Sequence, residues 1–483
     1  MGQYLSPGVY VEEVPPLSKP IAGVGTSTPG FIGVITVEKN QNSIKLPVQH
    51  ENSFGWTEYH LPAELGKAYK ITSWAGFTRL FGDLVGSNAK ASKEIITEGS
   101  GTEEKTYVTG IADPNFSITA RWKKDDASED KTTLGETDEN GNFKVEVDKG
   151  ITADKVTITT IIDSVDSITL DKNRQQLAHA VYGFFDNGGT GCYVIGIASA
   201  SDAELDKALK KFSAIDEISM VAAPGMDGDK IYDKLISHCE NLQDRVAILD
   251  SKEKVDDHTK LQSIPERPRN STYSAFYFPW LEVSDPATSL IEKNDGRLFV
   301  PPSGHVAGVY ARTDATRGVF KAPANEALRG VIGLKYSLSK ADQESLNREG
   351  VNVIRPLIGA IRVWGARTVG GDANGEYRYI STRRYFNYLR ESIDQGTQFV
   401  VFEPNSPALW ERIKRTVGGF LLNEWRSGAL FGVTPDQAFF VKCDAETNPP
   451  EVREAGRVVT EIGVAIVKPA EFVIFRIQQT SGG

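Results

Sequence analysis

The closing residues of this chain carry the pattern that most restricts how it can fold. The run Glu-Phe-Val-Ile-Phe-Arg-Ile near the end is typical of a strand with two apolar faces. Phe472 and Ile474 share one face, and Val473, Phe475 and Ile477 share the other, because side chains alternate along a strand. Chain ends usually fray unless something holds them. The run therefore predicts either a central strand of this chain's own sheet or a strand donated to another molecule.

The last third of the chain mixes strand and helix patterns. The apolar stretch Val351–Trp364 predicts one long strand, and Gly370–Gly375 predicts a polar loop after it. Ser381–Ile393 predicts a helix, because its apolar residues recur at every fourth position. Phe399–Phe402 predicts a short buried strand, and Val458–Val467 predicts a later one.

A second helix of this region has clear end signals. Ser406 can cap its start, and Pro407 suits the first helical position, where no N–H is needed. Gly428 is a natural stop. Two adjacent glycines, Gly418 and Gly419, should weaken this helix unless something approaches closely there or bends it.

The middle of the chain, residues 178–250, alternates strand and helix patterns, which predicts a mainly parallel sheet with helices on its faces. Ser201 and Glu204 predict a capping box at one helix start. Residues 85–170 differ: turn signals alternate there with short β patterns, which predicts a β-rich module inserted into the surrounding domain. This segment holds 10 basic and 17 acidic residues, most of the chain's net charge of −10.

Composition excludes several classes. The acidic balance disfavours general nucleic-acid binding. Three distant cysteines argue against a disulfide framework and for a reducing compartment. No window is long and apolar enough for a membrane span. The six histidines show no pair at metal-ligand spacing, so we expect neither a metal nor a cofactor.

Two stretches resemble catalytic or binding motifs. Asn187–Gly191 is rich in glycine like a phosphate loop, but it precedes a strand and has no following Lys-Ser/Thr, so a tight turn is the better interpretation. Ser303, His305 and Asp314 include the residue types of a hydrolase triad, without the Gly-x-Ser-x-Gly motif. We therefore expect no catalytic residues and no enzymatic activity.

Several motifs in a fixed order resemble contractile tail sheath proteins, which occur in contractile-tailed phages, R-type pyocins and extracellular contractile injection systems. The matching stretches are Asn352–Pro356, Ile361–Arg367, Tyr379–Arg384, Phe402–Asn405, Leu409–Ile413 and Phe420–Leu422, with Pro7–Glu13, Ala275–Leu281, Val300–Asp314 and Gly318–Asn325 before them. No single motif is specific, but the ordered set is.

The resemblance implies an α/β multidomain fold: a C-terminal α+β sheath core domain completed by exchanged terminal strands, a subtilisin-like α/β middle domain and the inserted β-rich module. The implied domains are a linking arm (1–22), the middle domain (23–84 and 171–345), the insert (85–170), the core domain (346–470) and a terminal strand (471–483).

The resemblance also implies a function and partners. The chain would be a structural subunit that polymerises helically, as stacked rings, around an inner tube in a metastable extended state. It would contract to drive the tube through a target envelope, with baseplate and tail terminator or cap proteins as further partners. Assembly would take place in the bacterial host cytoplasm, and the subunit would then be part of the phage tail or injection particle. No nucleic acid binds and the sheath itself inserts into no membrane in this reading.

The resemblance assigns roles to two residue sets. The intersubunit arms would be Val9, Tyr10, Val11 and Val14 at the start, with Phe472, Val473, Ile474, Phe475 and Ile477 at the end. The inner-tube contact would be Arg412, Arg415 and Arg426, the alternative being a solvated face with a Glu411–Arg415 pair. Two other functions stay open at this point: a hydrolase-like or nucleotide-binding enzyme, and a static filament protein.

Overall fold

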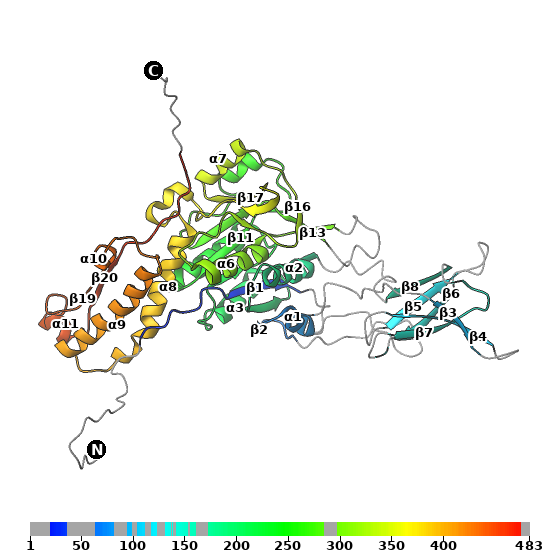
Figure 1. The fold of residues 1–483 in the computed structure, drawn as a ribbon, viewed down its shortest axis with the longest axis horizontal. Helices are drawn as coiled ribbons and strands as arrows, with labels where there is room; N and C mark the ends of the chain where they lie inside the picture. Colours follow the sequence, from blue (N-terminus) through cyan, green and yellow to red (C-terminus); the bar gives the residue numbers. More distant parts are fainter. Residues whose placement is uncertain are drawn as a thin grey trace, which may run out of the picture. The chain divides into compact units, whose positions relative to one another are not determined.

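The computed structural model describes residues 20–35, 63–81, 94–98, 104–111, 117–122, 131–136, 138, 142–152, 155–160, 172–284 and 297–474. The chain divides into two compact units (Figure 1). The smaller unit joins Met1–Val24 to Tyr385–Gly483, and the larger unit is Gly25–Arg384. No helix within the described ranges is long and apolar enough to cross a membrane.

The larger unit is built on a nine-stranded sheet in the order β15-β18-β17-β12-β11-β10-β1-β9-β2. Six neighbouring strands, from β17 to β9 in that order, are parallel, and the edge strands are antiparallel. The strands are β1 (Pro29–Val34), β2 (Ala68–Ile71), β9 (Cys192–Ile197), β10 (Met220–Ala222), β11 (Val246–Asp250), β12 (Ser274–Phe278), β15 (Glu326–Ala327), β17 (Val351–Leu357) and β18 (Ala360–Val363).

Helices cover both faces of this sheet, as the alternating pattern predicted. Alternate residues of β11 enter different cores: Val246 and Ile248 enter one, and Ala247 and Leu249 enter the other. The first core includes residues of α1 (Trp74–Phe81), α2 (Lys172–Asp186) and α6 (Ser303–Arg317). The second includes residues of α3 (Asp202–Phe212), α4 (Asp229–Leu242) and α7 (Lys340–Arg348). Burial on two faces explains why these strands are almost continuously apolar.

The hairpin β17–β18 corrects one prediction. The stretch Val351–Trp364 is not one strand, because the chain reverses at Ile358 and Gly359, which both have positive φ angles. A two-residue turn of this type matches the right-handed twist of paired strands. Since β17 pairs with β12, this stretch belongs to the large sheet. The two compact units divide between Arg384 and Tyr385.

The remaining elements of the larger unit are smaller. A three-stranded sheet contains β13 (Leu281–Ser284), β14 (Arg297–Val300) and β16 (Val331–Leu334), and two 3₁₀ helices are η4 (His258–Gln262) and η6 (Gly371–Tyr377). Ser201 lies at the N-cap of α3, but its side chain makes no capping bond, so the predicted capping box is wrong.

Residues 94–160 form two three-stranded antiparallel sheets, as the β-rich pattern predicted. One contains β3 (Glu94–Glu98), β4 (Lys105–Ile111) and β7 (Asn142–Val147), and the other β5 (Ser117–Trp122), β6 (Lys131–Glu136) and β8 (Val156–Thr160). Val108, Trp122, Val145 and Val156 are among the residues of their shared core. This module thus has an apolar core of its own.

The smaller unit is mostly helical. Its helices are α8 (Ile380–Gly396, whose first residues belong to the larger unit), α9 (Pro407–Arg426), α10 (Pro435–Ala438) and α11 (Pro450–Glu454), and its strands are β19 (Phe439–Lys442) and β20 (Glu461–Val464). The helices at 381–393 and from Pro407 are confirmed, and the positive φ of Gly428 follows the end of α9 as expected.

Three local predictions fail in this unit. Phe399–Phe402 is not a buried strand: Gln398–Val400 forms the 3₁₀ helix η7, and Val401 and Phe402 are exposed. Ser406 occupies the N-cap of α9 without a side-chain bond. The helix also continues through Gly418 and Gly419, where an added Cβ would meet nothing within 4 Å in the described chain.

A buried carboxylate, Asp250, lies at the start of α6. It accepts hydrogen bonds from the Ser303 amide and hydroxyl, both at 2.7 Å, and from the Gly225 amide at 3.3 Å. The N-cap residue of α6, Pro302, provides no side-chain bond, so Asp250 supplies the acceptor that a helix start needs. Burial raises the pKa of Asp250 to about 7, although its bonds to Ser303 act in the opposite direction.

This raised pKa predicts a pH dependence of stability. Between about pH 4 and about pH 7 the folded chain binds a proton at Asp250 that the unfolded chain has released, so stability falls as pH rises. The slope of this pH dependence is at most about 1.4 kcal/mol per pH unit. Above the folded pKa the slope is zero, because both states have then released the proton. Asp250→Asn should remove it. Denaturant unfolding at pH 5, 6, 7 and 8 checks this; parallel pH profiles for the two proteins would contradict it.

Candidate assembly surface

Several large apolar side chains of the smaller unit face solvent. Their shared feature is an exposed fraction of at least 57%, and they are Val401, Phe402, Phe431, Val433, Phe440, Phe472, Val473 and Ile474. Phe402 is fully exposed and also has a positive φ of 66°, which is uncommon for a side chain of its size. Exposed apolar side chains gathered in one unit indicate a surface that other proteins cover.

The sheet β19–β20 contributes open edges to this surface. Within the described residues the two strands pair in register with each other and with no third strand, for example Phe440 with Gly463. The Phe440 ring lies against Gly463, where a Cβ would collide with it, and the ring is still largely exposed. A two-stranded sheet is marginal by itself, and its outer N–H and C=O groups can receive further strands.

The apolar run Glu471–Ile477 lies apart from any sheet as far as it is described. Glu471–Ile474 has no strand pairing, and Phe472, Val473 and Ile474 are all exposed. The described residues Glu471–Ile474 thus form no strand of the chain's own sheet. Phe475 and Ile477 lie outside the described residues, as do Val9, Tyr10, Val11 and Val14 of the other arm.

The three candidate tube-contact arginines differ in their surroundings. Arg412 places its guanidinium 4.3 Å from the centroid of the Phe399 ring and is half-buried. Arg415 and Arg426 are exposed and make no ion pair within the described chain. They are eleven residues apart on α9, which brings them back to one face at about 100° per residue. Glu411 pairs with Lys414 at 2.5 Å, not with Arg415.

Two tyrosines of α8 hold α9 in position. The Tyr385 and Tyr388 hydroxyls donate to the two carboxylate oxygens of Glu424, at 2.9 and 3.0 Å. Burial and the charge of Glu424 raise the pKa of both phenols, so both keep their donor protons at neutral pH. This bond pair orients the face of α9 that carries Arg415 and Arg426.

The triad candidates of the larger unit serve different partners. The Ser303 hydroxyl donates to Asp250. His305 is buried, and burial, with nearby His179, lowers its pKa to about 3. Asp314 forms an ion pair with Arg384. The three side chains therefore do not form a catalytic chain.

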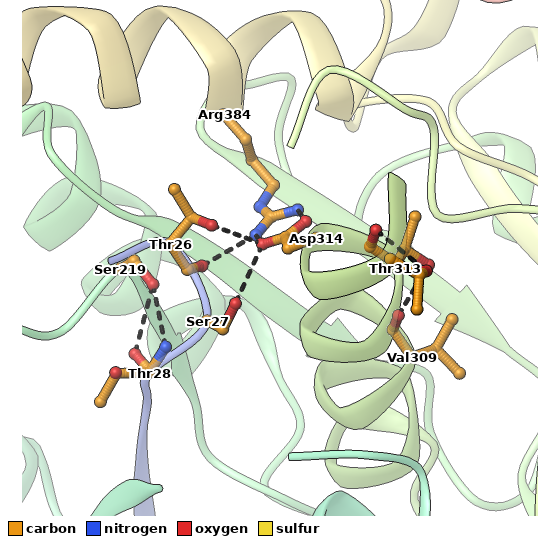
Figure 2. Close-up of polar contacts among 9 residues, drawn as sticks. Thr26, Ser27, Thr28, Ser219, Val309, Thr313, Asp314 and Arg384 are labelled. Atoms are coloured by element: carbon orange, nitrogen blue, oxygen red, sulfur yellow. Dashed lines mark hydrogen bonds and ion pairs between the residues drawn. The ribbon is translucent and has the colours of Figure 1, made fainter. Parts of the chain in front are cut away.

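Figure 2 shows the surroundings of Asp314. Its carboxylate accepts from both terminal nitrogens of Arg384, at 2.9 and 2.5 Å, and from the Thr26 hydroxyl at 2.7 Å. The Ser27 hydroxyl adds a bond at 3.3 Å, and Arg384 also donates to the Thr26 carbonyl at 2.9 Å. Both charged side chains are at most 4% exposed. We call this set the Asp314 cluster: Thr26, Ser27, Asp314 and Arg384.

Sequence reasoning missed much of this arrangement. Phe402 lies in a motif that carries the family resemblance. The apolar residues beside it favoured the wrong prediction of a buried strand. Phe431 and Val433 flank Gly432, and no periodic signal marks them as exposed. The one local signal against a strand there is Pro404, two residues after Phe402, because proline disfavours a continuing strand.

The Asp314 cluster predicts a large stability effect. Asp314→Asn removes the carboxylate charge and leaves Arg384 buried without its counter-ion, which should cost about 3–5 kcal/mol of unfolding free energy. The matched control is Glu217→Gln, which breaks the exposed pair with Lys70 and should leave stability nearly unchanged. Denaturant unfolding measures both. Equal effects in the two variants would contradict the assigned role of the cluster.

Comparison with known families now adds to this geometry. The family description "Phage tail sheath protein central domain" matches residues 198–369, and "Phage tail sheath C-terminal domain" matches residues 372–480. Among curated proteins, the tail sheath protein of Vibrio phage KVP40 is 28% identical over 192 residues, 39% of this chain and 28% of the relative. That of Burkholderia phage BcepMu is 29% identical over 212 residues, 42% of each chain. The matched part thus covers less than half the length of these two relatives.

Solved structures match over nearly the whole chain. A chain of the anti-feeding prophage baseplate is 26% identical with a TM-score of 0.61, and the match covers 99% of this chain and 100% of that one. A chain of the PVC sheath complex, an extracellular contractile injection system in its contracted state, shares the fold at 23% identity, with a TM-score of 0.63 and 99% coverage of both chains. With both sheath domains matched in order and the fold shared end to end, this chain belongs to the contractile tail sheath protein family.

Proposed function

We propose that this chain is the structural subunit of a contractile tail sheath, which polymerises helically around an inner tube and contracts to drive the tube through a target envelope. The observation that carries this proposal is the smaller unit's combination of an open two-stranded sheet and an exposed apolar tail. One copy offers strand edges, and another copy offers a strand that needs burial. The two features complement each other between copies, since the described part of the tail, Glu471–Ile474, pairs with no strand.

Strand exchange has a favourable energy. Removing a large apolar side chain from water is worth about 1.5–3 kcal/mol, and Phe472, Val473 and Ile474 are each mostly exposed. Added strands also pair with the outer N–H and C=O groups of β19 and β20. If the two ends of each chain bind different neighbours, several weak links act together and hold the polymer strongly.

Identical subunits joined head to tail by such links build an open helix when the rotation does not close. In the proposal the links stay paired during contraction while the folded units rotate and repack. The extended sheath is a metastable state held on its tube, and contraction releases energy stored at assembly by increasing the area buried between subunits. The subtilisin-like character of the middle domain belongs to this proposal and plays no catalytic part in it.

The proposal includes partners and a location. The exposed face of α9 with Arg415 and Arg426 would contact an acidic inner tube, while the ends of the sheath would meet baseplate and terminator proteins. Assembly would occur in the bacterial host cytoplasm. The domain boundaries inferred from the sequence, including an arm at each end, remain part of the proposal.

Deleting residues 1–19 should abolish polymerisation and leave a folded monomer, because the core residues that the structure describes all lie outside the deleted arm. A second deletion, from Glu471 onward, should do the same without loss of stability, since Phe472, Val473 and Ile474 are exposed in the single chain. Sedimentation and electron microscopy would detect polymers, and thermal unfolding would test the monomers. Ordinary sheaths from either deletion would overturn that arm's linking role.

Arg415→Glu combined with Arg426→Glu should reduce co-assembly with the tube at least tenfold, because charges at an interface govern encounter and specificity. The control carries the same charge change on another exposed helix face: Lys207→Glu with Lys210→Glu on α3. Co-sedimentation with tube protein measures both. If the two double variants co-assemble equally well, α9 is not the tube-contacting face.

A further inference from the structure

The chain segment that leads into the N-terminal arm lies along α8. Ile21 is 9% exposed and packs against Gly396, the last residue of α8. The Val24 amide donates to the Ser392 hydroxyl at 3.1 Å. Since Ile21 meets residue 396 and Val24 meets residue 392, residues 21–24 run antiparallel to the helix. Figure 1 shows this segment in dark blue beside α8.

Two glycines make this close approach possible. A Cβ at Gly23 would collide with the Tyr388 hydroxyl, which is itself held by its bond to Glu424. A Cβ at Gly396 would lie 2.5 Å from Cγ1 and 3.0 Å from Cβ of Ile21. Neither glycine has a positive φ, so backbone conformation does not require them. The glycines are required because the space between residues 21–24 and α8 is too narrow for a side chain.

The residues that follow are held as well, in the larger unit. Thr26 and Ser27 belong to the Asp314 cluster (Figure 2), and the Thr28 carbonyl accepts from the Ser219 hydroxyl at 3.4 Å. Ile21, Val24 and residues 26–28 therefore each have an apolar or polar contact that holds them. The segment that joins the arm to the folded chain is a fitted element, which we call the arm root (residues 20–24).

We propose that the arm root on α8 sets the point and direction from which the N-terminal arm leaves the subunit, and that it stays seated when subunits polymerise. This inference rests on the proposed linking role of the arm. If residues 20–24 were as free as a flexible tether, they would lose conformational entropy each time the arm bound a neighbour. A seated root has lost it already, so a neighbour captures an arm that is oriented in advance.

A disulfide across the seat tests both parts of the proposal. The double variant Ile21→Cys with Gly396→Cys removes the isoleucine side chain that Gly396 accommodates. It places two Cβ atoms 3.0 Å apart in the present backbone, so a small shift reaches the usual disulfide separation of about 3.8 Å. The three native cysteines are buried, so they should not compete. The monomer should cross-link readily on mild oxidation, whereas either single variant should not. The oxidised protein should polymerise within about twofold of the same protein reduced.

A second pair of variants tests the space itself. Gly396→Ala should slow polymerisation at least tenfold, because the added methyl group displaces Ile21 from α8. The matched control, Gly76→Ala on α1, adds the same methyl group to a helix of the larger unit, where its nearest neighbour is the Ser73 hydroxyl at 3.4 Å, an ordinary contact. In the Gly396→Ala monomer, protease cleavage within residues 20–24 should become at least tenfold faster, and in the control it should not change.

The outcomes separate this inference from the proposed function. Failure of the double variant to cross-link, loss of polymerisation only on oxidation, or normal assembly of Gly396→Ala would each overturn the seated root and leave the linking arm intact. Polymerisation after deletion of residues 1–19 would instead overturn the linking arm itself. Cross-linking with retained assembly, together with slow assembly of Gly396→Ala, supports the inference.

Discussion

The unsatisfied strand edges of β19 and β20 are the constraint on which the assembly surface depends. Two strands give each other one ladder of hydrogen bonds and leave an outer row on each. The tail at Phe472–Ile474 has the opposite deficit, because it has side chains to bury and no sheet to join. Neither deficit is corrected in the described single chain. In the proposed strand exchange a second copy would correct both, and polymerisation would then continue the burial that folding begins.

The helix α8 connects the parts of this system. Its first turn supplies Arg384 to the Asp314 cluster in the larger unit. Its later residues Tyr385 and Tyr388 orient α9 through Glu424, and Ser392 and Gly396 hold the arm root. One rigid element thus positions the proposed tube-contacting helix and the base of the proposed linking arm.

The larger unit uses residues that look catalytic for structural purposes. Ser303 and Asp250 complete the start of α6, and Asp314 neutralises Arg384 in a site with almost no solvent. A buried ion pair adds little stability compared with an apolar pair of the same size, but it is costly to break and accepts only one geometry. Such groups select one packing of the segment 25–28 against α6 and α8. This explains how charged residues can persist in the core of the larger unit.

The sequence by itself determined the periodic elements: the two-faced strands such as β11, the helices α8 and α9, and the β-rich module. Local pattern suffices there, because burial on one or two faces imposes a period on the residues. It also supplied the ordered motifs that indicate the family. Only the tertiary structure decided that Val351–Trp364 folds back as a hairpin of the large sheet, that Phe402 faces solvent, and that Arg412 stacks on Phe399 while Arg415 stays exposed. It alone revealed the seat at Gly23 and Gly396. These features depend on contacts between residues far apart in the chain, and a contact of that kind leaves no period in the sequence.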